Sequence, residues 1–281
     1  MNTSEASFQV EKKLDKEQFS WAQGAVATTA KRPEMFALII GIGNYKDTNI
    51  PPLDYTVNDA RGMYTLLTDP EHGYFKEENV RLLVDKQATT KNITKTLGIW
   101  LKESVGADDT VLLYFAGHGA PEAGNTYWVT YDSDINDLYN TGISNDKLSS
   151  LLKSIPSKTV LCFLDSCYSA ATVNRGWHTR SLVEKDPFKE FKGEGRVVIT
   201  SSSGKQKSLE SKEHGHGVFT YYLIEGLKGK ADQDNDGYII LDEVWDYVKF
   251  NVKNTASSFG YHQTPIIDGR HSAGILLSHW N

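Results

Sequence analysis

The sequence contains only two cysteines among its 281 residues, Cys162 and Cys167. Cys162 lies inside an apolar run and Cys167 follows that run, so they do not form the disulfide framework of a small secreted protein. No apolar stretch reaches the roughly 20 residues that a membrane-spanning helix needs, and residues 1–10 lack the basic and apolar parts of a signal peptide. We therefore expect a soluble protein of the reducing cytoplasm, with no membrane partner.

Basic residues are too few and too scattered to indicate nucleic acid binding. The chain has 30 Lys and Arg against 36 Asp and Glu, a formal net charge of −6, and no basic block. Binding through the phosphate backbone is therefore not expected. A chain of this length can bury a large core, which favours one α/β domain at residues 33–281 preceded by an N-terminal extension at residues 1–32.

Short apolar runs alternate with amphipathic segments along the chain, which predicts a doubly wound, mainly parallel sheet. The expected strands are residues 36–42, 80–84, 111–116, 159–164 and 196–200, with a hairpin around 127–130. The expected helices are residues 58–67, 90–102 with Thr90 as N-cap, 145–152, 218–227 and 241–252. Residues 171–194 are charged and aperiodic, and we interpret them as a flexible insert.

Two of the apolar runs end in residues that can do chemistry. Gly117-His118-Gly119 follows one run, and Asp165-Ser166-Cys167 follows the next. The carboxyl ends of parallel strands form the edge where open α/β sheets place their sites. If the two strands are neighbours, a thiol and an imidazole share one crevice, as a cysteine hydrolase requires. The alternative is a capped loop histidine beside a buried structural thiol.

These two motifs, 49 residues apart, resemble those of the caspase-like cysteine peptidases of family C14, specifically the bacterial and metacaspase-type branch. The resemblance covers roughly residues 36–267. It also rests on Asn58-Asp59, on Ser201-Ser202-Ser203, and on Gly217-Val218-Phe219-Thr220 at the start of a helix. It implies a caspase-hemoglobinase-like α/β/α sandwich with a six-stranded, mostly parallel central sheet, and a protein or peptide substrate.

The resemblance assigns a role to each residue of the two motifs. Cys167 attacks the peptide carbonyl as a thiolate, and His118 delivers the proton to the leaving amine. The backbone N–H groups of Gly119 and Cys167 are the expected donors of the oxyanion hole. This chemistry requires no cofactor.

The resemblance also implies a preference for basic substrates. Asp165 stands where animal caspases carry glutamine, and Asp59 falls where the metacaspase-type pattern has a second pocket acid, with Ser201 nearby. Two carboxylates in one partly desolvated pocket favour a guanidinium, so we expect cleavage after Arg and secondarily after Lys. Thr56 and Ala116 replace the usual cysteine and serine of the pocket wall. Asp59 as a helix N-terminal acid, Asp165 as a turn cap, and a preference for Asp in the substrate remain alternatives.

Cleavage after basic residues would make the chain a candidate substrate of itself, and thus a zymogen. Arg175 and Arg180 lie in the insert, and Lys31 and Arg32 lie at the boundary of the extension. The resemblance further suggests a role in bacterial defence or regulated cell death, with any regulatory partner unidentified.

A second motif, residues 232–243, matches the twelve-residue EF-hand loop. The expected Ca²⁺ ligands are the carboxylates of Asp232, Asp234, Asp236 and Glu243 and the carbonyl of Tyr238. The sequence shows no second loop of this kind, and EF-hands normally pair, so a metal-free acidic turn is the alternative. The calcium loop of metacaspases is poorly represented, because Asn145-Asp146 stands where that pattern has two acids.

The loop also supports a rival function, a non-enzymatic, calcium-dependent interaction module on a caspase-like scaffold. Two further patterns are weaker. The segment at residues 41–46 lacks the third glycine of a dinucleotide-binding loop. His214 and His216 lack a third metal ligand nearby, and we interpret them as residues of a polar loop.

Overall fold

A computed structural model describes residues 33–122, 124–167, 191, 195–203, 206 and 208–280. The predicted extension at residues 1–32 and the insert at residues 171–194, except Phe191, lie outside the described residues. The four basic residues named above as possible cleavage sites also lie outside them. Among the residues that are described, no helix is long and apolar enough to cross a membrane.

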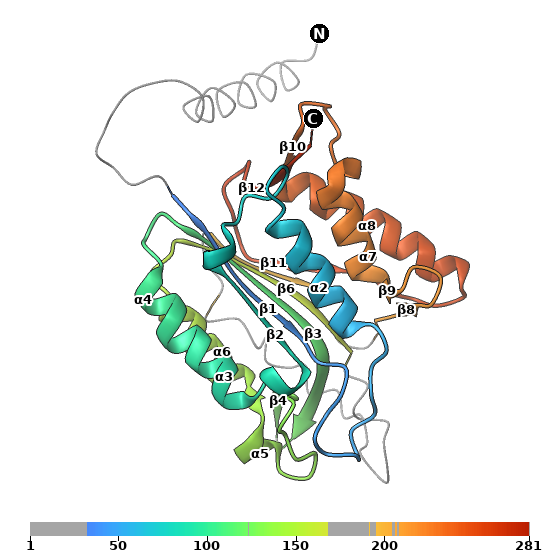
Figure 1. The fold of residues 1–281 in the computed structure, drawn as a ribbon. Coiled ribbons are helices and arrows are strands. Elements are labelled where there is room, and N and C mark those ends of the chain that lie inside the picture. Colours follow the sequence, from blue (N-terminus) through green and yellow to red (C-terminus); the bar gives the residue numbers. More distant parts are fainter. Residues whose placement is uncertain are drawn as a thin grey trace.

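A central sheet lies between two layers of helices (Figure 1). Its main path has the order β11-β7-β6-β3-β1-β2, with every neighbouring pair parallel except β11 and β7. The predicted six-stranded, mostly parallel sheet is therefore confirmed, and β4 and β5 extend it beside β3. The strands of the main path are β1 Met35–Gly41, β2 Val80–Val84, β3 Thr110–Glu122, β6 Thr159–Cys167, β7 Arg196–Thr200 and β11 Ile266–Asp268.

The remaining strands are short and lie outside that path. They are β4 Asn125–Trp128, β5 Ile143–Ser144, β8 Glu210–Ser211, β9 His216–Gly217, β10 Tyr238–Ile240 and β12 Leu276–His279. The α-helices are α2 Thr56–Leu67, α3 Thr90–Lys95, α4 Lys102–Ser104, α5 Leu138–Thr141, α6 Asn145–Lys153, α7 Val218–Glu225 and α8 Leu241–Ser258. The described residues also form two π-helical turns, Thr96–Leu101 and Gly226–Lys230, and two 3₁₀ turns, Glu77–Asn79 and Asp85–Gln87.

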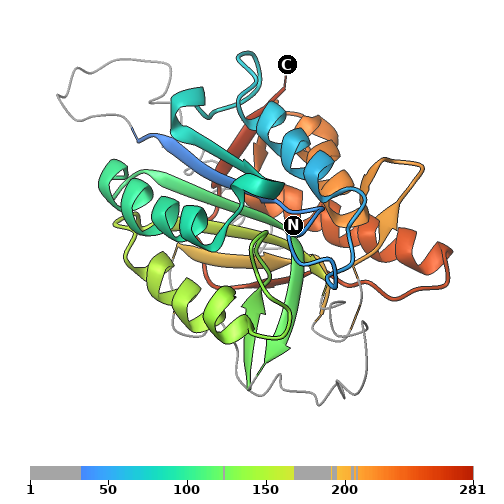
Figure 2. The ribbon, with the colours of Figure 1, turned by 60° about the horizontal axis from the view of Figure 1, so that its bottom comes forward.

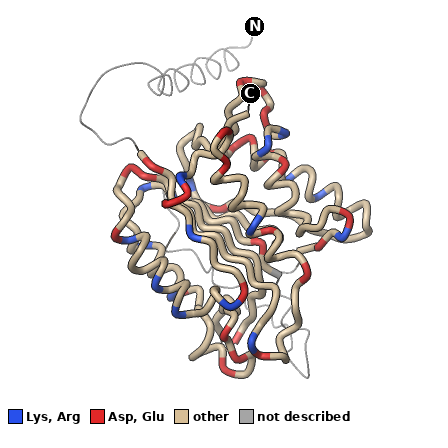
Figure 3. Tube along the Cα trace, viewed as in Figure 1, with Lys and Arg blue, Asp and Glu red and all other residues tan. Residues whose placement is uncertain are grey.

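Burial on both faces explains why the central strands are continuously apolar. In β1, Ala37 and Ile39 pack into the cluster under α2, α7 and α8, whereas Leu38 and Ile40 pack into the cluster under α3, the π-helical turn Thr96–Leu101 and α6. Figure 2 shows the two helical layers on opposite sides of the strands. Figure 3 shows that charged residues are largely absent from the central strands. Polar groups at their carboxyl ends therefore stand out against an apolar sheet.

Several predicted boundaries are corrected by the structure. The N-cap of the helix at residues 90–102 is Thr89, whose hydroxyl accepts from Asn92 N at 3.2 Å, and the helix reaches Ser104 through the π-helical turn. Strand β3 continues past the apolar run to Glu122, and the predicted hairpin returns as β4. Helix α8 extends to Ser258, beyond the predicted end at residue 252.

The capping assignment predicts a difference between two threonines of the same helical segment. Thr89→Ala removes the acceptor for Asn92 N and is expected to lower the free energy of unfolding by about 1 kcal/mol. Thr96→Ala, whose hydroxyl donates only to Asn92 O, is expected to cost nothing because alanine has the higher helix propensity. Chemical denaturation measures both, and equal losses would contradict the assignment.

Candidate functional site

The backbones of the two predicted catalytic residues are direct neighbours. Strands β3 and β6 pair in parallel over nine positions, and the last pair is His118 with Cys167. Both residues therefore lie at the carboxyl edge of the sheet. Strand β1 lies between β2 and β3, so the strand order reverses between β1 and β3. In α/β folds, ligands commonly bind at the carboxyl ends of the strands beside such a topological switch point.

His118 is held by the segment that follows β1. Its side chain is buried, and its Nε2 lies 2.9 Å from the carbonyl oxygen of Pro51. The ring of Tyr45 stacks on the imidazole with centroids 5.4 Å apart, and the Tyr45 hydroxyl accepts from His118 N at 3.0 Å. Burial lowers the pKa of His118, and the Pro51 carbonyl partly opposes this. A neutral ring that donates from Nε2 has its basic nitrogen at Nδ1.

The backbone N–H of Gly119 is directed to the β6 side of β3. Backbone groups of successive residues in a strand point to opposite sides, and the Ala116 carbonyl accepts from Ile42 N on the β1 side. The His118 carbonyl likewise accepts from Val129 N on that side. The Gly119 N–H therefore points away from β1 and toward the end of β6, a direction suited to an oxyanion donor.

Asp165 is a buried carboxylate satisfied by hydroxyl groups. Its Oδ1 accepts from Ser208 Oγ at 2.6 Å, and its Oδ2 accepts from Thr220 Oγ1 at 2.7 Å. Thr220 Oγ1 is also 2.6 Å from the hydroxyl of buried Tyr114. Burial raises the pKa of Asp165, and the hydroxyl donors oppose that rise. These partners come from distant segments, so Asp165 does more than cap a local turn.

Asp59 lies in the first turn of α2, but its carboxylate bonds to another element. Oδ1 is 2.7 Å from His216 Nδ1, and both oxygens lie 3.2 Å from Gly217 N. Burial raises the pKa of Asp59 to about 7; the hydrogen bond from His216 opposes this, and the charge of Asp165 adds to it. The helix dipole alone therefore does not account for its position.

Gly217 lies between the two acids. A Cβ at this residue would be 2.8 Å from Asp165 Oδ2 and 3.2 Å from Asp59 Oδ2. Any other residue would force the carboxylates apart, so the glycine permits their convergence. The structure thus brings two of the predicted pocket residues to one point.

Two buried hydroxyls near this region have no ordinary hydrogen bond within the described residues: Thr56 Oγ1 and Ser201 Oγ. The Ser201 hydroxyl is close enough to Asp165 to lower its pKa, yet the geometry is not that of a hydrogen bond. An unsatisfied buried hydroxyl costs roughly 1–3 kcal/mol, so a partner such as water or a polar ligand group would stabilise these two. Ala116 is paired with Asp165 across the two strands and contributes no polar group.

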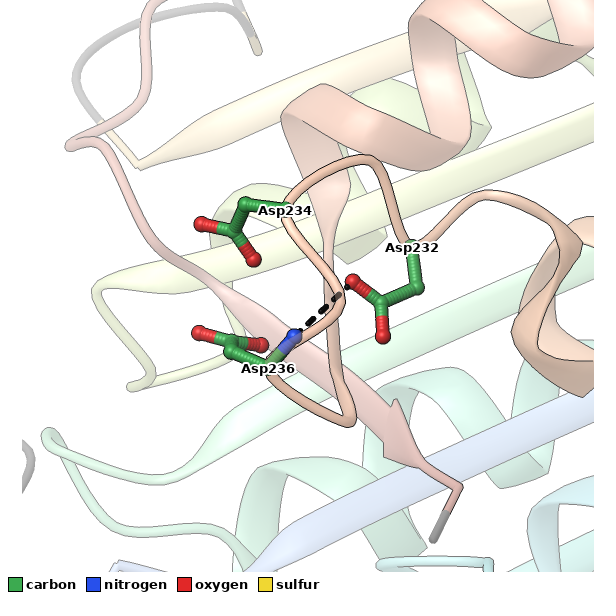
Figure 4. A group of neighbouring side chains, drawn as sticks. All are labelled: Asp232, Asp234 and Asp236. Carbon is green, nitrogen blue, oxygen red and sulfur yellow. Dashed lines mark hydrogen bonds between the residues drawn. The ribbon is translucent and has the colours of Figure 1, made fainter.

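The calcium-type loop forms a compact turn between the end of the α7 segment and α8. Asp232, Asp234 and Asp236 each place a carboxylate oxygen within 4.8 Å of the others (Figure 4). Asn235 and Gly237 adopt positive φ angles of 57° and 80°, which produce the sharp turn. These hard oxygen donors are of the kind that Ca²⁺ prefers.

The other predicted ligands of this loop lie at the start of β10 and α8. Glu243 accepts backbone N–H groups from Gln233 and Ile240, both at 3.2 Å. Burial raises the pKa of Glu243, and the charges of the neighbouring loop acids add to the rise. Tyr238, the predicted carbonyl ligand, begins β10, which pairs antiparallel with β12.

Some site residues were missed by the sequence analysis. Ser208 and Thr220 hold Asp165, and Tyr45 and Pro51 hold His118. Two sequence features contained some of these residues. Thr220 belongs to the motif at residues 217–220 that opens α7, and Tyr45 belongs to residues 41–46, the segment that lacks the third glycine of a dinucleotide-binding loop. The interpretation of His216 as a simple polar-loop residue was wrong, because it lies in β9 and pairs with a pocket acid.

Comparisons with known proteins gave a family model and a solved structure of similar fold. A family model described as the caspase domain matches residues 34–273. A crystal structure of a Geobacter sulfurreducens protein is similar in fold, with a TM-score of 0.59 and 18% sequence identity over 86% of this chain and 95% of that one. No curated protein gives a significant match.

The raised pKa of Asp59 predicts how stability changes with pH. Its native value of about 7 exceeds the usual value of 3.8, so the native state binds the extra proton and Asp59 costs stability as pH rises between these values. We therefore compare the free energy of unfolding of Asp59→Asn with that of the wild type at two pH values. The variant-minus-wild-type difference should increase by more than about 1 kcal/mol from pH 5 to pH 8. Denaturant unfolding at both pH values measures this, and a pH-independent difference would contradict it.

Proposed function

Because this chain belongs to the caspase domain family, we propose that it is a cysteine endopeptidase that cleaves after basic residues, Arg first and Lys second. One observation carries the proposal. Two buried carboxylates, Asp59 and Asp165, converge on Gly217 beside the sheet edge where His118 and Cys167 are paired.

The proposed reaction proceeds through a covalent intermediate. His118, neutral and with a basic Nδ1, takes the thiol proton of Cys167, and the sulfur forms a bond to the substrate carbonyl carbon. The oxyanion is stabilised by the N–H of Gly119 and that of Cys167. The C–N bond then breaks as His118 returns the proton to the amine. Water, activated by the same imidazole, hydrolyses the thioester and releases the acid product.

The charge of the pocket supports the preference for Arg. Two carboxylates that repel each other in a buried site are stabilised by a cation between them, and a guanidinium offers several donors in a planar fork. A lysine ammonium supplies the charge with less directional hydrogen bonding, whereas an aspartate would add a third negative group. The unsatisfied hydroxyls of Thr56 and Ser201 are further groups that a polar substrate side chain could engage.

We also propose that the protein is cytoplasmic and that it is made as a zymogen, an inactive precursor that it cleaves itself. Its own insert carries Arg175 and Arg180, which meet the proposed specificity. Cleavage there would be self-processing. A role in bacterial defence or regulated cell death fits such an activity.

Reporter peptides that differ only at the residue before the cleaved bond test the specificity. We expect cleavage of the Arg peptide, slower cleavage of the Lys peptide, and at least about 100-fold lower kcat/KM for the Asp or citrulline peptide, because each lacks the cation.

Cys167→Ala should abolish cleavage, and His118→Ala should reduce it by at least about 100-fold. Intact mass spectrometry of the wild type and of Cys167→Ala shows whether residues 171–194 are cut. Retained activity in Cys167→Ala, or faster cleavage of the Asp peptide, would refute the proposal. Calcium-dependent partner binding without labelling by a thiol probe would favour the non-enzymatic alternative.

We also propose that residues 232–243 bind one Ca²⁺ ion. The convergent oxygens of Asp232, Asp234 and Asp236 support this, and Glu243 would complete the set by releasing its backbone N–H partners. The ion would add rigidity to the turn between α7 and α8. The peptidase chemistry takes place without it.

Calorimetric titration of the whole protein with CaCl₂ tests the loop. We expect one site, weakened at least about 10-fold by Glu243→Gln, because the twelfth position normally supplies two oxygens. Asp242→Asn changes the charge equally at a position outside the expected ligand set and serves as the matched control. Equal weakening in the two variants, or no binding by the wild type, would contradict the assignment.

A further inference from the structure

The two pocket acids are satisfied by different kinds of partner. Asp165 is held by the neutral hydroxyls of Ser208 and Thr220, whereas Asp59 is held by the imidazole of His216 and by Gly217 N. Within the part of the chain that the structure describes, Asp59 alone of the two acids contacts a side chain that can carry positive charge. His216 is therefore the side-chain partner of Asp59 before any substrate is bound.

The placement of His216 is specific. It lies in β9, which forms a short hairpin with β8, and its side chain is one-quarter exposed while that of Asp59 is 3% exposed. A Cβ at Gly62 of α2 would be 3.3 Å from His216 Cε1, so the absence of a side chain there lets the ring lie against the helix. Gly62 thus leaves room for the His216 ring, and Gly217 leaves room for the two carboxylates.

Asp59 needs this partner because its surroundings favour the protonated form. The titratable groups around it are Asp165 on β6, Tyr114 on β3 and His216 on β9, with Glu210 on β8 close enough to interact with Asp165. Of these, His216 alone supplies a hydrogen bond that stabilises the ionised carboxylate. Gly217 N adds a backbone hydrogen bond, but no charge.

We propose that His216 is a positioning residue of the substrate pocket, which favours the ionised form of Asp59 and directs its carboxylate toward Gly217 so that the pocket accepts a basic side chain. This inference rests on the proposed function. His216 acts through Asp59 and does not touch the reacting bond, so its loss should affect binding of the basic side chain much more than the chemical step.

Three variants on the same hairpin test the inference. His216→Ala should raise KM for the Arg peptide at least about 10-fold at pH 7, change kcat less than about 2-fold, and reduce the preference for Arg over citrulline. The defect should shrink as the pH is raised above 7, because a larger fraction of Asp59 then ionises in the variant as well. His216→Asn, whose amide nitrogen replaces Nδ1, should recover most of the loss. His214→Asn is the matched control, because His214 stacks on Tyr221 instead of contacting an acid.

A second readout keeps this inference separate from the proposed specificity. In the Cys167→Ala background, ¹³C NMR of the Asp59 carboxyl follows its titration directly, with no need for turnover. The pKa of Asp59 should rise in His216→Ala and return toward the wild-type value in His216→Asn. An unchanged Asp59 titration, a loss confined to kcat, or failure of His216→Asn to recover either readout would overturn the inference. A wild type without Arg cleavage would refute the proposed function alone, and the titration would still decide the role of His216.

Discussion

The parallel pairing of β3 with β6 is the constraint on which the candidate site depends. It sets His118 opposite Cys167 and Ala116 opposite Asp165 in a single register. Because side chains alternate between faces, a slip of one residue would turn Asp165 from the α7 side of the sheet to the opposite face. Apolar residues buried on both faces of the two strands oppose such a slip. The packing of the core thus fixes the geometry of the polar edge.

The second constraint is the cost of burying two carboxylates close together. The fold meets it with donors from elements far apart in sequence: a hydroxyl in the first turn of α7, a serine before β8, and a backbone N–H and an imidazole in β9. Removing any donor would leave a buried charge less well compensated. The α7 segment and the β8–β9 hairpin therefore form part of the surroundings of the two acids, although none of their residues was among the predicted site residues.

The elements that sequence predicted well are those with a strong local pattern. The strand Val80–Val84 and the strand Arg196–Thr200 were predicted to the residue, because each is a short apolar run between polar segments. The N-cap was assigned to the wrong one of two adjacent threonines. Either fits the local pattern, and the choice is made by tertiary contacts: the Thr90 hydroxyl bonds to Thr130 and to the Thr141 carbonyl, which leaves Thr89 to cap. The contact of Asp59 with His216 spans 157 positions and leaves no local signal.

The pairing of β10 with β12 has a consequence for any ion held by the acidic loop. In paired EF-hands, the strand within one loop binds the strand of its twin, which allows occupation of one loop to influence the other. Here the strand of the loop, β10, already pairs with β12, with Ile239 opposite Ser278. Within the described residues, no second loop of this kind pairs with β10. Saturation of the acidic loop should follow a simple hyperbola with a Hill coefficient of one, so it would rise gradually with the ion concentration instead of switching at a threshold.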